Sequence, residues 1–228
     1  MNELALFAGA GGGILGGLLL GWRTRVAVEI DPYCRSVLLA RQRDGILEPF
    51  PIWDEIKTFD GRPWRENIDV VSGGFPCVAW STAARGNNTG ENLWPEMLRV
   101  IGEVQPRFVL AENVDEGAIA QAQDDLTQCG YTTNRGMLAG FHVGADHPRK
   151  RWWLVADSDN KSELGSGINA KMAVKSARRN RLWSSLPDDK RMDDGFPNRM
   201  DRLKAIGNSQ VPAVAALAWE ILLGGNQQ

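Results

Sequence analysis

A cysteine in a turn that follows two glycines is the first candidate for a catalytic residue in this sequence. Residues 73–81 read "GGFPCVAWS", with Cys77 directly after Pro76. The thiolate form of cysteine is a nucleophile, and a strand that ends at paired glycines can hold such a group at the mouth of a cleft. The alternative is an inert buried cysteine. We prefer that alternative for Cys34 and Cys129, because both fall within helical patterns.

Two other segments carry groups that would assist a nucleophile. Glu112 stands in "AENV" at the end of an apolar run. A carboxylic acid can donate a proton or a hydrogen bond where electron density builds, provided that burial raises its pKa. Arg149 and Arg151 alternate in "HPRKR", so an extended backbone would point them to the same side. The alternatives are a helix-start carboxylate and solvated charges at a strand end.

A glycine-rich loop follows the first apolar run, in "FAGAGGGILGG". Gly11, Gly13 and Gly16 fit the spacing G-x-G-x-x-G, and Glu29 ends the next apolar run 18 residues after Gly11. This order is similar to a dinucleotide-binding fingerprint, in which an acid binds the ribose diol. The pattern does not separate NAD from other adenosine-bearing cofactors. A flexible loop without a ligand is the alternative.

The elements that position these groups alternate between strand and helix. Asp31 and Pro32 fit the N-cap and the first position of a helix. We expect strands at 4–8, 26–30, 68–74, 107–114 and 151–157, with helices at 31–43, 93–104, 116–130 and in "GNSQVPAVAALAWEILLGG", where Ser209 and Pro212 open the helix. This alternation predicts an α/β fold with a parallel sheet and helices on both faces.

The composition is that of an ordinary globular protein. The chain has 228 residues, of which 43% are hydrophobic and 24% charged. No apolar run approaches the ~20 residues that span a bilayer, and "MNELALF" lacks the basic region of a signal peptide, so we expect a cytoplasmic protein. Three dispersed cysteines and two histidines do not fit a zinc site, and we expect no metal.

The charge distribution is uneven. From Arg149 to Gly207 there are 14 Lys/Arg and 8 Asp/Glu, a net charge of +6, whereas the whole chain carries −2. Between Asp157 and Asp194 the sequence is polar and aperiodic. A basic segment on an acidic body suggests nucleic-acid binding. A solvated, partly disordered segment is the alternative.

Five segments, "FAGAGG", "GGFPC", "AENV", "HPRKR" and "GNSQVP", occur in this order along the chain. Together they closely resemble the DNA cytosine-5 methyltransferases over about residues 1–157 and 195–223. The resemblance implies a Rossmann-like, mostly parallel sheet that binds S-adenosylmethionine. It divides the chain into a catalytic domain (1–157), a short basic target-recognition segment (158–206) and a C-terminal helix that returns to the catalytic domain (207–228).

The resemblance also implies a mechanism. Cys77 would attack carbon 6 of a flipped-out cytosine, so that carbon 5 becomes nucleophilic enough to take the methyl group. Glu112 would act at ring nitrogen 3. Arg149 and Arg151 would lie near the cytosine carbonyl oxygen and the backbone.

The cofactor residues are implied in the same way. Phe7 would lie against the adenine, Glu29 would bind the ribose hydroxyls, and Asp54 would accept from the adenine amino group. The remaining contacts would come from the glycine loop, the strand ends and the last helix, at Gly9, Ala10, Gly11, Ile30, Pro76, Leu93, Asn208 and Ser209.

Double-stranded DNA is the expected partner, and a monomer the expected state. Residues 81–92, beginning with Ser81, would form a lid, or an ordinary mobile loop. The recognition contacts would come from basic side chains that hold phosphates and from a tryptophan beside the flipped base, at Lys171, Lys175, Arg178, Arg179, Arg181 and Trp183. A disordered charged tether is the alternative for this cluster.

The chain also departs from the family. Val78 and His147 stand where the family usually has glutamine, and fewer than 50 residues separate Asp157 from Gly207. So short a recognition region predicts a short or loose target site, in a compact form that looks like phage or prophage enzymes.

Three other functions remain open from the sequence. A tRNA cytosine-5 methyltransferase shares the same motifs. A DNA-binding relative with little or no turnover would fit the short recognition region, although intact Cys77, Glu112 and Arg151 argue against it. An NAD-dependent oxidoreductase would fit the glycine loop but leaves "GGFPC" and "AENV" unexplained.

Overall fold

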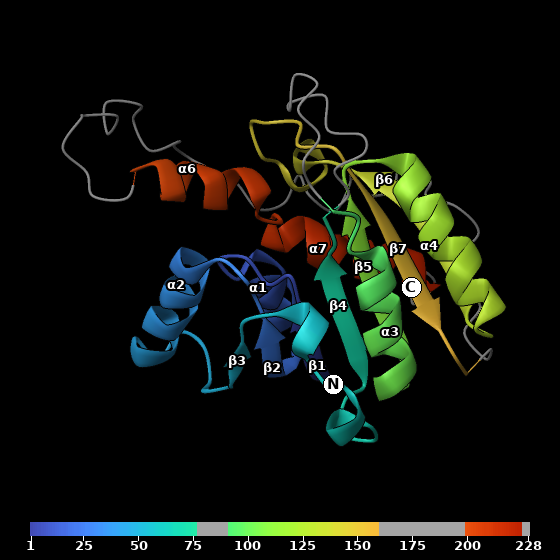
Figure 1. Cartoon of the computed structure of the whole chain (residues 1–228). Coiled ribbons are helices and arrows are strands. Elements are labelled where there is room, and N and C mark those ends of the chain that lie inside the picture. Colours follow the sequence, from blue (N-terminus) through green and yellow to red (C-terminus); the bar gives the residue numbers. More distant parts are fainter. Residues whose placement is uncertain (77–90, 160–198, 225–228) are drawn as a thin grey trace.

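The computed structural model describes residues 1–76, 91–159 and 199–224, and within them the strands form one twisted sheet (Figure 1). The order across the sheet is β3-β2-β1-β4-β5-β7-β6. Neighbouring strands are parallel except at β7, which runs antiparallel to both β5 and β6. The strands are β1 (Asn2–Leu6), β2 (Arg23–Val28), β3 (Ile52–Trp53), β4 (Val70–Gly74), β5 (Phe108–Asn113), β6 (Thr132–Leu138) and β7 (Arg151–Asp157).

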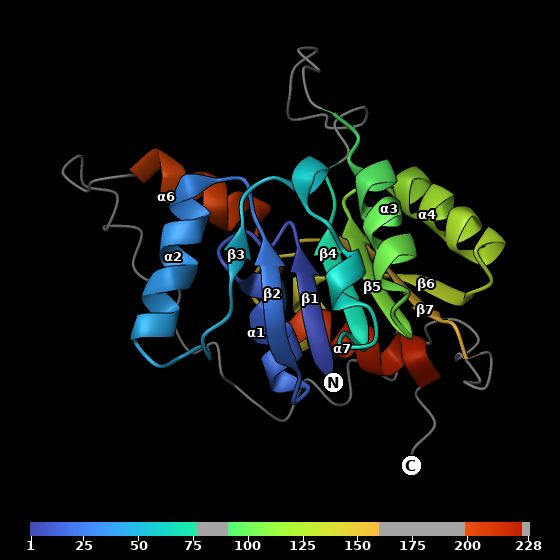
Figure 2. The same cartoon turned by 60° about the horizontal axis from the view of Figure 1, so that its bottom comes forward.

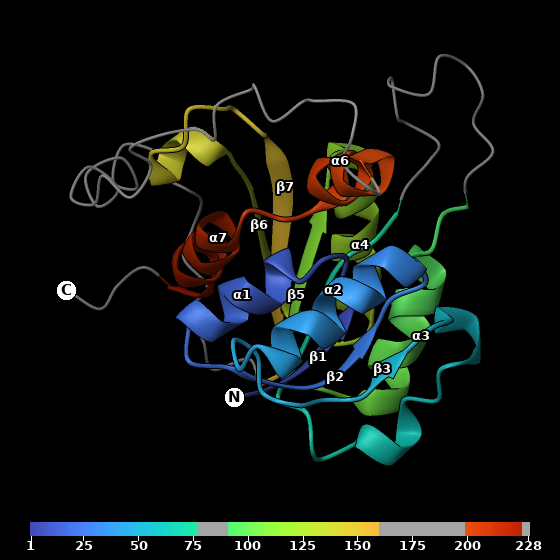
Figure 3. The ribbon, with the colours of Figure 1, turned by 90° about the vertical axis from the view of Figure 1, so that its left-hand side faces the viewer.

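Helices cover both faces of this sheet, as the alternating pattern predicts. Figure 3 shows α1, α2 and α7 on one face and α3 and α4 on the other. The helices are α1 (Gly12–Leu19), α2 (Pro32–Arg43), α3 (Trp94–Val104), α4 (Glu116–Gln128), α6 (Arg199–Asn208) and α7 (Pro212–Gly224), with short 3-10 turns η1 (Ile56–Thr58), η2 (Arg62–Trp64) and η5 (Gly140–Val143).

Each face of the sheet has its own apolar core, because successive strand residues point to opposite sides. Leu4 and Leu6 of β1 pack into the core under α3 and α4, whereas Ala5 between them packs with α1 and α2. Beneath α7, the Trp219 ring meets the rings of Trp22 and Phe108 edge-on, with centroids 4.7 and 5.2 Å apart. All of β5 is buried, which fixes the residues at its carboxyl end firmly.

The predicted helix at 31–43 is confirmed as α2. The Asp31 carboxylate caps it by accepting from the backbone N–H groups of Tyr33 (2.9 Å) and Cys34 (3.4 Å), and Pro32 is its first residue. No helix was expected at α6. The last helix begins at Pro212, so Gly207 and Asn208 belong to α6 and Ser209 lies in the connection between the two helices. Proline suits a first helical position because it has no N–H to satisfy.

Three of the segments predicted to carry chemistry, "FAGAGG", "GGFPC" and "AENV", lie at the carboxyl ends of the parallel strands β1, β4 and β5, whereas "HPRKR" leads into the antiparallel β7 and "GNSQVP" joins α6 to α7. In Figure 2 the strands lie side by side, and α6 lies near the end towards which β1 and β2 point, beside α2. An ion pair joins α6 to α2, with Lys204 Nζ 2.8 Å from Asp31 Oδ2. A ligand site at this edge is the general rule for open α/β sheets.

No helix in the described part of the chain is long and apolar enough to cross a membrane.

Candidate active site

Gly74 is the last residue of β4, Glu112 is the last but one of β5, and the two lie directly opposite one another. They are paired in the register of β4 and β5, and Glu112 is 7% exposed. A Cβ atom on residue 74 would lie 2.5 Å from Glu112 Oε2, closer than atoms can approach. Glycine at position 74 therefore makes room for the carboxylate. This contact accounts for the second glycine of the pair that precedes Cys77.

Arg151 forms an ion pair with Glu112. Its Nε lies 2.8 Å from Glu112 Oε1, and both side chains are largely buried. Burial raises the pKa of Glu112, and the nearby Arg151, the Gln210 amide and Arg149 lower it by less than burial raises it. The carboxyl group therefore takes up a proton more readily than an exposed glutamate does. A raised pKa of this kind is what an acid at this position requires.

Arg149 has a different set of partners. Its Nη2 donates to the carbonyl oxygens of Gly207, at 2.8 Å, and Ser209. The sequence predicts an extended backbone from Arg149 to Arg151. That prediction is wrong, because β7 begins at Arg151 and Arg149 has a φ of 27°. Arg149 thus holds the chain between α6 and α7, although its charge still acts on Glu112.

Asn113 braces the segment that leads to Cys77. Its Nδ2 donates to the backbone oxygen of Phe75 at 2.9 Å, and its Oδ1 accepts from the N–H of Asp115 at 3.0 Å. This pair of bonds ties the start of the Cys77 segment to the strand end that carries Glu112. Cys77 itself lies outside the described residues.

The turn after β1 is held by Glu29. Its Oε2 accepts from the Gly9 N–H at 2.6 Å and its Oε1 from the Asp31 N–H at 2.8 Å. Phe7, Gly9 and Gly11 all have positive φ, at 52°, 54° and 92°. Left-handed backbone is unusual for phenylalanine and is often found at functional sites. A Cβ on Gly9 would meet nothing within 4 Å, so the backbone there borders open space.

The glycines further along this loop serve helix packing. A Cβ on Gly16 would lie 2.8 Å from the Cβ of Ala215 and 2.9 Å from the carbonyl oxygen of Pro212, and one on Gly12 would collide with the carbonyl oxygen of Gln210. Gly13 and Gly16 of the G-x-G-x-x-G pattern therefore allow α7 and the connection before it to pack closely on α1, and Gly11 allows the close approach of Leu38 in α2. The spacing carries no separate evidence for a dinucleotide.

A small cavity lies between the glycine loop and Glu112. Phe7, Gly9, Asn208 and Ser209 line it, together with Gly74 and Gln210. Of the other expected cofactor residues, Ile30 is 64% exposed and Asp54 is exposed just after β3, and neither lines this cavity. Pro76 is exposed and accepts from the Leu93 N–H at 3.2 Å. Ala10, Gly11, Glu29, Pro76 and Leu93 do not line this cavity.

The expected DNA contacts cannot be placed. Ser81 and the recognition residues Lys171, Lys175, Arg178, Arg179, Arg181 and Trp183 all lie outside the described residues. Within the described ranges, no group of three His, Cys, Asp or Glu side chains could hold a metal ion.

Sequence reasoning missed Gln210, which reaches Glu112 with its Nε2 3.4 Å from Oε2. The residue sits inside "GNSQVP", but spacing alone gives no sign that it faces a strand end about a hundred residues earlier.

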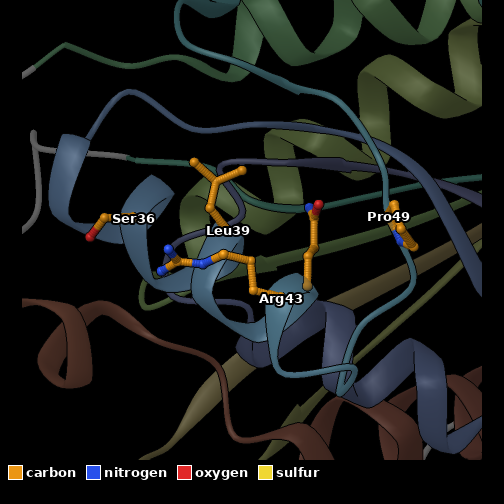
Figure 4. Close-up of a pocket in the computed structure, with 5 residues that line it drawn as sticks. Ser36, Leu39, Arg43 and Pro49 are labelled. Atoms are coloured by element: carbon orange, nitrogen blue, oxygen red, sulfur yellow. The ribbon is translucent and has the colours of Figure 1, made fainter.

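A larger hollow, of about 570 Å³, lies elsewhere, on the outer side of α2 (Figure 4). Leu39, Arg43 and Pro49 line it with Ser36 and Gln42. Two of its polar groups are already engaged, since Ser36 Oγ donates to the Tyr33 carbonyl and Gln42 Nε2 to the Phe50 carbonyl. It is remote from the strand ends and holds no candidate for catalysis.

The sheet order and the site at its carboxyl edge define a Rossmann-like methyltransferase fold. Residues 1–216 match the family model described as C-5 cytosine-specific DNA methylase, and the protein belongs to this family.

Relatives within the family are similar over most of this chain. The type II methyltransferase M.Eco47II of Escherichia coli is 34% identical over 178 residues, which cover 73% of this chain and 41% of that protein. M.CviJI of Paramecium bursaria Chlorella virus IL3A is 29% identical over 169 residues, 68% of this chain and 42% of that protein. The structure of a DNMT2 mutant from Spodoptera frugiperda aligns with a TM-score of 0.58 at 18% identity, over 74% of this chain and 53% of that chain. The chain thus spans about half the length of the proteins it matches.

Proposed function

We propose that this protein transfers a methyl group from S-adenosylmethionine to carbon 5 of cytosine in DNA. The observation that carries the proposal is the buried Glu112–Arg151 ion pair at the strand end beside the Cys77 segment. The family match and the type II DNA methyltransferases among its relatives support DNA as the acceptor.

The chemistry assigns one role to each group. The Cys77 thiolate adds to carbon 6 of the cytosine, and carbon 5 then forms its bond to the methyl group. Water then takes up the carbon-5 proton, and cleavage of the bond between sulfur and carbon 6 restores the aromatic ring and the thiolate. Glu112 donates to ring nitrogen 3 as electron density builds there. Arg151 orients the Glu112 carboxyl group and presents its remaining N–H groups to the cytosine oxygen.

The residues at the carboxyl edge suit S-adenosylmethionine. Backbone next to open space at Gly9, the exposed Ile30 and the half-buried Phe7 offer room and apolar surface for an adenosine. Glu29, Asp54, Asn208 and Ser209 supply polar groups around it. When bound, this cofactor supplies an electrophilic methyl group on a sulfonium. The proposal keeps the expected division of the chain, with target recognition assigned to residues 158–206.

The test is methyl transfer by the full chain, with labelled S-adenosylmethionine and either duplex DNA or tRNA as acceptor. We expect label in DNA that is absent with Cys77→Ser, and bisulfite-type sequencing should place it on cytosines in a short sequence context. Label in tRNA alone would replace DNA with RNA as the substrate. Transfer to neither acceptor would contradict the proposed function.

A thermal shift tests the cofactor separately, because a ligand stabilises only the fold that binds it. S-adenosylhomocysteine should raise the melting temperature and NAD should not. The reverse result would favour an oxidoreductase.

A further inference from the structure

Gln210 spans the space between the glycine loop and the proposed catalytic acid. It lies in the connection between α6 and α7, and it lines the cavity at the strand ends. Its Nε2 lies 3.4 Å from Glu112 Oε2, and Arg151 occupies the other carboxylate oxygen at 2.8 Å. Each oxygen of Glu112 therefore has its own donor, one charged and one neutral.

Three glycines make room for this side chain. A Cβ on Gly13 would lie 2.5 Å from Gln210 Oε1, and one on Gly74 would lie 3.0 Å from Gln210 Nε2. A Cβ on Gly12 would strike the Gln210 carbonyl oxygen. The amide thus lies between the loop proposed for the cofactor and the strand ends of β4 and β5. A side chain at any of these three positions would displace it.

The backbone before Gln210 is fixed as well. Arg149 donates to the carbonyl oxygens of Gly207 and Ser209, the second of which is the residue next to Gln210. Among the described residues, the charged groups that act on Glu112 are Arg151 from β7 and Arg149 from the segment before it. Arg151 and Gln210 therefore contact the same carboxyl group, and the charge of Arg149 also acts on it.

We propose that Gln210 is a positioning residue that holds the Glu112 carboxyl group in place and couples it to the glycine loop. This inference rests on the proposed function, in which Glu112 works as an acid. The amide N–H stabilises the carboxylate form of Glu112. The same amide lies against Gly13 in the first turn of α1, directly after the turn proposed to bind the cofactor, so movement of that turn would change the environment of the acid.

The experiment measures Glu112 directly and needs no turnover. The full chain is labelled with ¹³C at glutamate side-chain carboxyls, and the Glu112 signal, assigned by its loss in Glu112→Gln, is followed against pH by NMR. Gln210→Met removes the donor at nearly constant size and should move the Glu112 titration midpoint to higher pH by about half a pH unit. Gln210→Glu places a second carboxylate there and should move it further in the same direction.

Coupling to the loop is read in the same titration. Adding S-adenosylhomocysteine should change the Glu112 midpoint in the wild type and change it less in Gln210→Met. Gln42→Met is the matched control, because it also removes a side-chain amide bond, to the Phe50 carbonyl at 3.1 Å, but on the outer side of α2. It should leave the Glu112 midpoint unchanged.

Unchanged Glu112 titration in both Gln210 variants, with native circular dichroism, would overturn the inference. If the protein transfers no methyl group but the midpoint moves as expected, the proposed function fails and the contact stands. A second outcome concerns the pH profile of the methyl-transfer rate. If transfer occurs and the rate falls at the same alkaline pH in wild type and Gln210→Met, the positioning role fails and the proposed function stands.

Discussion

Two buried glutamates lie on the same face of the sheet and have opposite kinds of partner. Glu112 lies one residue before the end of β5, contacts Arg151 and the Gln210 amide, and feels the charge of Arg149. Glu3 lies in β1, 1% exposed, and accepts only from the Ser72 hydroxyl at 2.6 Å and the Thr24 hydroxyl at 2.7 Å among the described residues. Burial raises the pKa of both, and that of Glu3 rises to about 7. A raised pKa therefore does not by itself mark the catalytic acid.

Position and the charge of the partners distinguish the two. Glu112 opens onto the cavity at the carboxyl edge, whereas Glu3 is enclosed by three strands and by α1, where Gly17 lies against it. Glu3 lies in a cluster with two neutral hydroxyl groups and does not line that cavity. Of the two carboxyl groups, Glu112 is the one that borders a space in which a base could approach it.

Exchanging each carboxylate for an amide tests this contrast most strongly. Glu112→Gln should lower the single-turnover rate of methyl transfer by about 10²–10³-fold, because the amide cannot supply a proton. Glu3→Gln should leave that rate close to wild type. Equal losses in the two variants, with folding checked by circular dichroism, would mean that burial matters here and position does not.

The stability of the protein should depend on pH through Glu3. Its pKa is about 7 in the folded protein against an ordinary 4.5, so the folded state favours the protonated form. This stabilisation is complete below about pH 4.5 and is lost as the pH rises through about 7, by up to roughly 3 kcal/mol. Glu3→Gln should abolish this part of the pH dependence of the free energy of unfolding, measured by urea titration at pH 5 and pH 8. A parallel pH dependence in wild type and variant would contradict the assignment.

A methyl group at Gly74 should disturb Glu112 without touching Glu3. Gly74→Ala should lower the free energy of unfolding by about 1–3 kcal/mol, because its Cβ overlaps the Glu112 carboxylate and the Gln210 amide. It should also reduce methyl transfer. The control is Gly102→Ala in α3, where a Cβ meets nothing within 4 Å and alanine favours the helix. Full activity of Gly74→Ala would show that the strand end tolerates movement of the acid.

The smallest effect is expected at the exposed ion pair between α6 and α2. Lys204 and Asp31 lie at the surface, with the lysine side chain 63% exposed. Lys204→Ala should therefore change the free energy of unfolding by less than about 1 kcal/mol, and added salt should remove the difference. A larger loss in the free energy of unfolding that persists in salt would mean that this pair stabilises the protein as strongly as the buried contacts of the site.

The order of strands and helices could be predicted because the apolar runs of this chain are strongly patterned. The buried β5 and the Asp31–Pro32 start of α2 are examples in which local sequence dictates structure. β6 was missed because "TTNRGML" is polar and mostly half-buried near the sheet edge, so it lacks an apolar run. The kinked backbone at Arg149 was missed because alternation of residue types does not report φ.

Within the site, the sequence located the groups but not all of their partners. The family resemblance implied that Glu112 and Arg151 would both lie beside the cytosine, but it did not imply the ion pair between them. The carbonyl contacts of Arg149 and the reach of Gln210 depend on how the connection between α6 and α7 crosses the glycine loop. That path is set by the packing of α7 on α1, which no short motif encodes. The glycines at 11, 13 and 16 show the same limit, because their spacing suggested a ligand and their neighbours are the protein itself.

The reversed direction of β7 has a consequence for how the acid acquires its cation. In a parallel strand, the first residue would lie at the far edge of the sheet, about 20 Å from the ligand side for a strand of this length. Because β7 enters the sheet from the opposite end, its opening residue, Arg151, arrives beside Glu112 at the closing end of β5. One inverted strand thus lets the beginning of one segment and the end of another share a single site, without an extra loop to bring them together.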